Sequence, residues 1–144
     1  MAYYFKVLDS NRTGGFQKWK WPGIGVWTPK IKGKLKMCEN GYHICRPREI
    51  FTWYRYHSIN NIWLVETKYK VIKSNNKVAT RQARLIRRLE LSLPMINAAI
   101  KSAGLNEKIV YKSDFIIWFV VRPTGIQKKI MKHFFKVWKI KAKW

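Results

Sequence analysis

The sequence has few acidic residues, few cysteines and no long apolar run, and each shortage excludes a class of protein. The 7 Asp and Glu residues are scattered and form no paired-carboxylate motif for general acid–base catalysis. The 2 cysteines are too few for a secreted disulfide scaffold. The longest apolar run, Phe115 to Val121, is far shorter than the roughly 20 residues of a spanning helix. Walker and zinc-deaminase motifs are also missing.

The features that the sequence lacks also predict its cellular compartment. The N-terminal segment 1–11 has a strand pattern and lacks the apolar region of a cleavable signal peptide. The sequence therefore predicts a cytoplasmic protein, or one of the host cytoplasm if a phage encodes it.

What the sequence has in excess is positive charge. Lys and Arg number 30, the net charge is +23, and 47% of the residues are apolar. The apolar fraction predicts one folded domain over residues 1–144. So basic a chain repels itself unless it meets a polyanion, and nucleic acid is the commonest such partner. An anionic membrane surface is the second possibility, and a merely solvated basic surface is the third.

Hydrophobic periodicity predicts an α+β domain with helices packed on a mostly antiparallel sheet. The expected strands are Tyr3–Leu8, Ile31–Met37, Ile62–Ile72 and Asp114–Val121. The expected helices are Pro47–Tyr56, Arg84–Leu91, Pro94–Ala103 and Ile126–Ile140. The segment Val78–Leu91 fits two interpretations, because it also reads as a strand that pairs with Ile62–Ile72; we expect a strand followed by a helix.

The segment Lys36–Trp53 concentrates the reactive side chains. Cys38, His43 and Cys45 form a C-x4-H-x-C pattern, but a structural zinc site needs a fourth ligand. We expect no metal. A Cys/His nucleophile pair is an alternative, because Tyr42 and His43 precede a predicted helix N-terminus. Against it, Cys45 sits in a strand-like setting typical of a buried core cysteine.

Three stretches are candidates for nucleic-acid contacts. In the first, aromatic side chains for base stacking alternate with lysines for phosphates, although the same rings would serve a core; it contributes Lys18, Trp19, Lys20 and Trp21. The second would place Arg81, Arg84, Arg87 and Arg88 on one helical arc. The third is a basic amphipathic C-terminal helix with Lys128, Lys129, Lys132, Lys136 and Lys139 opposite an apolar face. That helix could face nucleic acid, an anionic membrane or plain solvent.

Several blocks resemble a family of small phage and bacterial proteins. They are YYFKVLD, then W-x-W-P, C-x2-G-Y-H-x-C-R-P, W-L-V-E and K-V-A-x-R-x-A-R-L-x-R-R-L. The resemblance covers roughly residues 3 to 90, about three-fifths of the chain, and leaves residues 91–144 as an extension. It implies a phage or mobile-element origin and no particular activity.

A second, weaker resemblance is to ADP-ribosyltransferase folds. There, a glycine-aromatic turn before a helix holds NAD, and Gly41-Tyr42-His43 has a similar layout. The resemblance implies an NAD-dependent transferase acting on nucleic acid, with Tyr42, His43 and one glutamate as catalytic residues. Glu66 is the glutamate we expect, and Glu90 and Glu107 are the other candidates. The chain departs from the pattern, because Ile44 and Cys45 replace small hydroxyl residues and no late glutamate stands out. Without that activity, we expect no cofactor.

Overall fold

In the computed structural model, which describes residues 3–14, 19–54, 60–142 and 144, two small antiparallel sheets pack against a group of helices. The larger sheet has the order β1–β3–β6, from strands Tyr3–Asp9, Asn60–Thr67 and Ala83–Leu89. The smaller sheet has the order β2–β5–β4, from Tyr42–Ile44, Val78–Thr80 and Ile72–Lys73. The two sheets meet where Phe5 and Cys45 exchange backbone hydrogen bonds of 2.9 and 2.8 Å. The predicted α+β class is confirmed.

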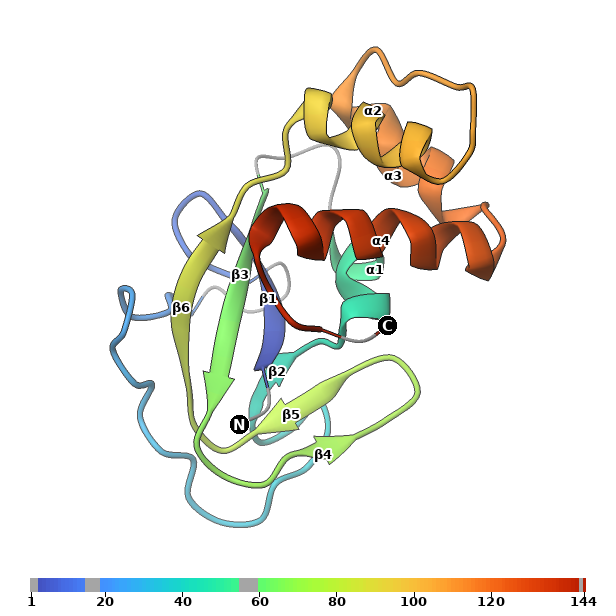
Figure 1. Ribbon diagram of the computed structural model, residues 1–144. Coiled ribbons are helices and arrows are strands. Elements are labelled where there is room, and N and C mark those ends of the chain that lie inside the picture. Colours follow the sequence, from blue (N-terminus) through green and yellow to red (C-terminus); the bar gives the residue numbers. More distant parts are fainter. Residues whose placement is uncertain (1–2, 15–18, 55–59, 143) are drawn as a thin grey trace.

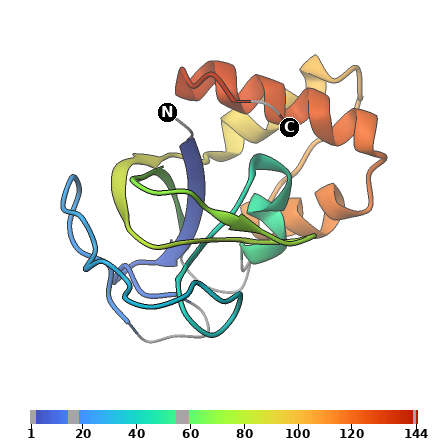
Figure 2. The same ribbon diagram turned by 90° about the horizontal axis from the view of Figure 1, so that it is seen from below.

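The helices gather on one side of the molecule. They are α1 Ile50–Trp53, which follows the 3-10 turn η1 Pro47–Glu49, then α2 Leu93–Ser102, α3 Lys112–Val120 and α4 Thr124–Trp138. Helix α4 crosses the face of the larger sheet (Figure 1). The long segment between β1 and β2 lies on the side away from α2 and α4 (Figure 2). None of the helices in the described part of the chain is long and apolar enough to cross a membrane.

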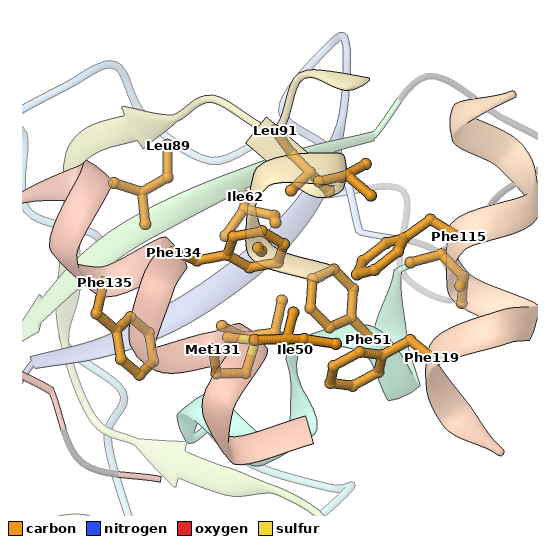
Figure 3. Packing of buried hydrophobic residues seen from close by; sticks show 14 of the residues in the cluster. Ile50, Phe51, Ile62, Leu89, Leu91, Phe115, Phe119, Met131, Phe134 and Phe135 are labelled. Atoms are coloured by element: carbon orange, nitrogen blue, oxygen red, sulfur yellow. The ribbon is translucent and has the colours of Figure 1, made fainter. Parts of the chain in front are cut away.

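Phenylalanines dominate the core beneath these helices (Figure 3). Phe115 and Phe134 are both 0% exposed, and their ring centroids lie 5.9 Å apart. Each of the two rings also contacts the ring of Phe51. We call the group Phe51, Phe115, Phe119, Phe134 and Phe135 the phenylalanine cluster. Burying each ring contributes about 1.5–3 kcal/mol, so the cluster anchors α1, α3 and α4 to the sheet.

Two of the predicted helices are confirmed. The segment Pro94–Ala103 is α2, whose N-cap Ser92 accepts a hydrogen bond from the backbone N–H of Met95. Ile126–Ile140 is α4, which buries Ile130, Phe134 and Trp138 as its amphipathic pattern requires. The helix predicted at Pro47–Tyr56 is reduced to η1 and α1, and its last two residues lie outside the described part of the chain.

The strand predicted at Asp114–Val121 is wrong, because these residues belong to helix α3. The β-branched and aromatic side chains favour a strand, but a short apolar run without alternation fits either structure. Packing decides for the helix. Phe115, Ile116 and Phe119 share one buried face, whereas Ile117 and Val120 are exposed.

The helix predicted at Arg84–Leu91 is also wrong, because these residues lie mainly in strand β6. A bulge explains the error. Val65 pairs with Leu85 and Leu64 pairs with Arg87, so Ile86 is an extra residue in β6. The extra residue breaks the two-residue period of the strand, and the sequence then imitates a helical arc.

The strands predicted at Ile31–Met37 and Ile62–Ile72 need correction. Segment 31–37 is a loop whose carbonyls are held by side chains: Arg81 donates to the carbonyls of Ile31 and Gly33. Segment 62–72 divides into β3 and β4, which belong to different sheets.

Candidate functional site

A cavity of about 830 Å³ opens between β1, β2 and the segment that connects them. Its lining includes Lys6, Trp19, Trp21, Tyr42, His43 and Lys77, together with Cys38 and Cys45. This volume lies within the range of roughly 300–1,000 Å³ that is usual for small-molecule sites. Gly41, with φ +147°, lets the chain turn into β2 here; a Cβ atom would meet Leu35 and Ala79 at 3.2 and 3.3 Å.

Three aromatic side chains form one wall of the cavity, and we call Trp19, Trp21 and Tyr42 the aromatic wall. Their ring centroids are 5.3 Å apart for Trp19–Tyr42, 5.6 Å for Trp21–Tyr42 and 5.9 Å for Trp19–Trp21. The Tyr42 hydroxyl donates a 2.5 Å hydrogen bond to the carbonyl of Pro29. Burial raises the pKa of Tyr42, and a hydrogen bond with Thr28 opposes the shift. The wall is therefore fixed in place, yet Trp19 remains 40% exposed.

The polar part of the cavity lining is basic and comes from two lysines and a histidine. Burial lowers the pKa of Lys6, against a weaker raising effect of Cys45. The pKa of His43 is lowered mainly by burial and then by the charges of Lys6 and Lys77. Glu39 is the only acid among the described lining residues, and it is exposed and 3.9 Å from Lys36. The cavity is therefore electropositive, with Lys6 partly desolvated.

The cysteine–histidine arrangement does not form a proton-transfer pair. The backbone N–H of Cys38 donates a 2.9 Å hydrogen bond to Nε2 of His43, so this nitrogen is already occupied as an acceptor. Lys77 Nζ donates to Sγ of Cys38. Cys45 is buried, its Sγ lies 3.4 Å from the carbonyl oxygen of Phe5, and burial raises its pKa to about 12. His43 thus supports the turn at Cys38, where φ is +67°.

No metal site is apparent among the described residues. In that part of the chain, no group of three or more His, Cys, Asp and Glu side chains could hold a metal ion.

The three residues expected to be catalytic do not lie together. Tyr42 and His43 line the cavity, but Glu66 is not among its described lining residues. Glu66 is opposite Tyr3 in β3, and its carboxylate pairs with Arg84 at 2.8 Å. Side chains alternate along β1, so Tyr3 and Lys6 project from opposite faces of the sheet. Glu66 is therefore on the other face from the cavity's Lys6.

The arginines expected on one helical arc mostly make internal contacts. Arg81 holds the loop at Ile31 and Gly33, Arg84 pairs with Glu66, and Arg87 donates to the carbonyl of Trp138. Arg88 is exposed. These contacts join the sheet to a loop and to α4. Among the four arginines only Arg84 forms an ion pair with a described residue, whereas Arg81 and Arg87 keep their charge and donate to backbone carbonyls.

The lysines of α4 are placed as the sequence predicts. Lys128, Lys129, Lys132, Lys136 and Lys139 are all exposed. Among the described residues, none of them forms an ion pair. The helical periodicity also predicts Val137 on the apolar face, together with Ile130, Phe134 and Trp138, but Val137 is 49% exposed. Lys20 is exposed beside the aromatic wall, and Lys18 lies outside the described residues.

Sequence reasoning missed Lys6 and Lys77. Lys6 had a detectable signal, since Tyr4, Lys6 and Leu8 share one face of β1 and the other two are buried. A lysine at an inward position of a strand is unusual and indicates a site. Lys77 follows a turn and gave no such signal.

The chain was compared with known families, curated proteins and solved structures. A family model described as a domain of unknown function, DUF7666, matches residues 2–96. The match includes both sheets and every residue named above as lining the cavity, and it ends within α2. No curated protein and no solved structure matches the chain.

Proposed function

The chain belongs to the DUF7666 family of domains of unknown function, and we propose that it is a basic protein that binds nucleic acid. Binding uses phosphate contacts and has little sequence specificity, because lysines neutralise backbone charge without reading bases. The resemblance of its sequence blocks to phage and bacterial proteins supports a phage or mobile-element origin. Its site of action is then the cytoplasm of the host.

The observation that carries this proposal is the two-sided character of α4. Its apolar side is packed into the phenylalanine cluster, with Ile130 and Phe134 both 0% exposed. That packing fixes the orientation of the helix, so the lysines on the other side face solvent as a rigid basic surface. The sequence has no acid after Asp114, which leaves these lysines without a nearby acid on their own helix. We call Lys128, Lys129, Lys132, Lys136 and Lys139 the α4 lysine surface.

Burial of the apolar face also favours nucleic acid over a membrane. A helix that lies on a bilayer inserts its apolar side into the lipid. In α4 that side is already covered by the domain, and Trp138 donates its indole N–H to the carbonyl of Glu90 at 2.6 Å. The exposed surface that remains is cationic and suits a phosphate backbone.

An NAD-dependent transferase related to ADP-ribosyltransferases is the second candidate. The observation in its favour is that Tyr42 and His43 line one cavity of suitable size. The position of Glu66, which is not among the described lining residues and lies on the other face of the sheet from Lys6, weakens it. NAD would be its cofactor, whereas the nucleic-acid proposal needs none.

The leading proposal is tested by measuring affinity for a labelled oligonucleotide at several salt concentrations. Each phosphate neutralised contributes a log–log slope of about −0.7 for a single strand and about −0.9 for a duplex. We expect affinity to fall steeply between about 50 and 200 mM salt, as is general for multiple phosphate contacts. Absence of binding at the lower salt concentration, or affinity that does not respond to salt, would overturn the proposal.

A further inference from the structure

The cavity combines an aromatic wall with desolvated positive charge, which is the chemistry of a site for a nucleoside phosphate. We infer that it binds one unpaired nucleotide, with the base against the aromatic wall and the phosphate toward Lys6 and Lys77. The nucleotide comes either from a nucleic-acid single strand or from free solution. In the first case the inference rests on the nucleic-acid binding proposed above.

The wall is suited to stacking because its faces are both available and fixed. Trp19 is 40% exposed, whereas Trp21 behind it is 4% exposed. Tyr42 is anchored through its hydroxyl to Pro29, so the wall needs little ordering when a base arrives. Every base has a π-face, so such a wall accepts bases without strong preference.

The charge argument depends on Lys6. This lysine lies 5.8 Å from the ring of Trp21, on a strand whose neighbouring side chains are buried. No carboxylate in the described part of the chain forms an ion pair with it. A partly desolvated cation without a paired anion is unfavourable for the fold, and a bound anion would offset that cost. A phosphate beside Lys6 and Lys77 supplies it.

The position of the aromatic wall inside the cavity also determines whether single-stranded or duplex nucleic acid can use the site. A base stacked inside a duplex cannot reach a recessed aromatic wall unless it is extruded, which costs a few kcal/mol. Single strands present their bases freely. The cavity therefore adds affinity for single strands and none for an intact duplex, while the α4 lysine surface acts on both.

The experiment compares four variants for binding of a labelled ten-nucleotide deoxyadenosine strand and of a blunt-ended duplex with G·C pairs at both ends, which presents no unpaired base. Trp19→Ala removes one stacking face, Trp19→Phe restores an aromatic face, and Lys6→Met removes the charge. Tyr111→Ala is the matched control, because Tyr111 is an aromatic residue that is 69% exposed and lies outside the described cavity lining. Titrations with AMP, NAD and inorganic phosphate, monitored by tryptophan fluorescence, test whether the cavity binds a ligand from free solution.

We expect Trp19→Ala to weaken single-strand binding by about 5- to 150-fold, the equivalent of one lost stacked base. Trp19→Phe recovers most of the loss, Lys6→Met weakens binding without lowering the melting temperature, and Tyr111→Ala changes nothing. Binding of the blunt-ended duplex stays as in the wild type for all four variants.

The remaining outcomes separate this inference from the proposed function. Binding of AMP or NAD that Trp19→Ala abolishes, with no oligonucleotide binding at all, supports the cavity site and overturns the nucleic-acid proposal. Single-strand binding that Trp19→Ala leaves unchanged, with no binding of AMP or NAD, overturns the cavity site and leaves the proposal intact. Quenching by inorganic phosphate equal to that by AMP shows that the base plays no part and also overturns the inference.

Discussion

The phenylalanine cluster beneath α4 and the aromatic wall of the cavity consist of similar rings in different surroundings. The cluster is closed: Phe115 and Phe134 are fully buried and contact only the interior. The wall is open, because Trp19 is exposed at a cavity that also holds Lys6 and Lys77. The comparison teaches that aromatic content alone does not distinguish core from ligand site. What distinguishes them is whether a ring is exposed beside a lysine that has no ion-pair partner among the described residues.

The two groups also differ in their place in the family. The cavity and its wall lie within residues 2–96, which the DUF7666 model matches, whereas α3 and α4 lie beyond them. The α4 lysine surface therefore belongs to the part of this chain outside the matched region. On this account, the proposed nucleotide cavity lies in the matched domain, and the basic helix lies beyond it.

The largest effect is expected on the stability of the closed group. Phe134→Ala removes a fully buried ring and should lower the free energy of unfolding by about 3–5 kcal/mol. Thermal melting should detect this as a decrease of about 10 °C or more in Tm. Trp19→Ala is the matched substitution in the aromatic wall and should lower the free energy of unfolding far less. Equal losses of Tm for the two variants would show that the wall is core.

The next effect concerns the α4 lysine surface. Lys132→Ala combined with Lys136→Ala should reduce the magnitude of the salt slope for single-strand binding by about 1.4, the value for two phosphates. Stability should change by less than about 0.5 kcal/mol, because both side chains are exposed. The control is Lys101→Ala with Lys108→Ala, since these exposed lysines lie outside α4. An equal change of slope in the control pair would mean that the total charge of the protein, and not the position of the lysines on α4, determines binding.

A smaller effect is expected at Lys6, and its sign is informative. The pKa of Lys6 is lowered in the folded state, so folding disfavours its charged form at neutral pH. Lys6→Met should therefore leave Tm unchanged or raise it, while it weakens binding of a single strand. Thermal melting and binding on the same preparation check both parts. A clear decrease in Tm would indicate that Lys6 serves the fold and not a ligand.

The smallest effect is a pH dependence at His43. Its folded pKa lies below 6.5, so the unfolded state binds the proton more readily. The contribution of His43 to stability is therefore complete above about pH 6.5 and is lost as pH falls through the lower folded pKa. Chemical denaturation of the wild type and of His43→Gln between pH 7.5 and about 5 should show a shallower decline for the variant. Asp9 does not interfere, because its pKa is lowered from 3.8 by hydrogen bonds from Thr13. Identical declines would mean that protonation elsewhere governs this range.

Much of this architecture could be predicted from the sequence, and each wrong prediction has a physical cause. The period of α4 is undisturbed, so its buried and exposed faces could be assigned from the sequence, except for Val137 at the edge of the apolar face. In β6, the bulge at Ile86 shifts the alternation, and the arginines then resemble a helical arc. In α3, the packing of Phe115 and Phe119 overrides a local preference for strand. Local pattern therefore predicts regular elements but not those that a bulge or tertiary packing controls.

The candidate site was predictable only in part. Tyr42 and His43 were found through the glycine turn before them, and Trp19 through its alternation with lysines. The cavity itself depends on the contact between β1 and β2, through Phe5 and Cys45, which are far apart in the sequence. No local pattern contains that contact, so the approach of Lys6 and Lys77 to His43 could not be predicted.

The most direct test of the difference between the two aromatic groups is to follow the indole N–H signals of the 8 tryptophans by NMR. The signals are assigned with Trp→Phe variants, and a single-stranded oligonucleotide is then added in steps. The account predicts that the Trp19 signal shifts, because its ring faces the cavity. The Trp138 signal should move less than that of Trp19 even though Trp138 lies near Lys136 and Lys139, because its indole N–H donates to the carbonyl of Glu90 and its ring packs against Phe134 and Phe135. Saturating binding that leaves Trp19 unmoved, or that moves Trp138 as much, would contradict the account.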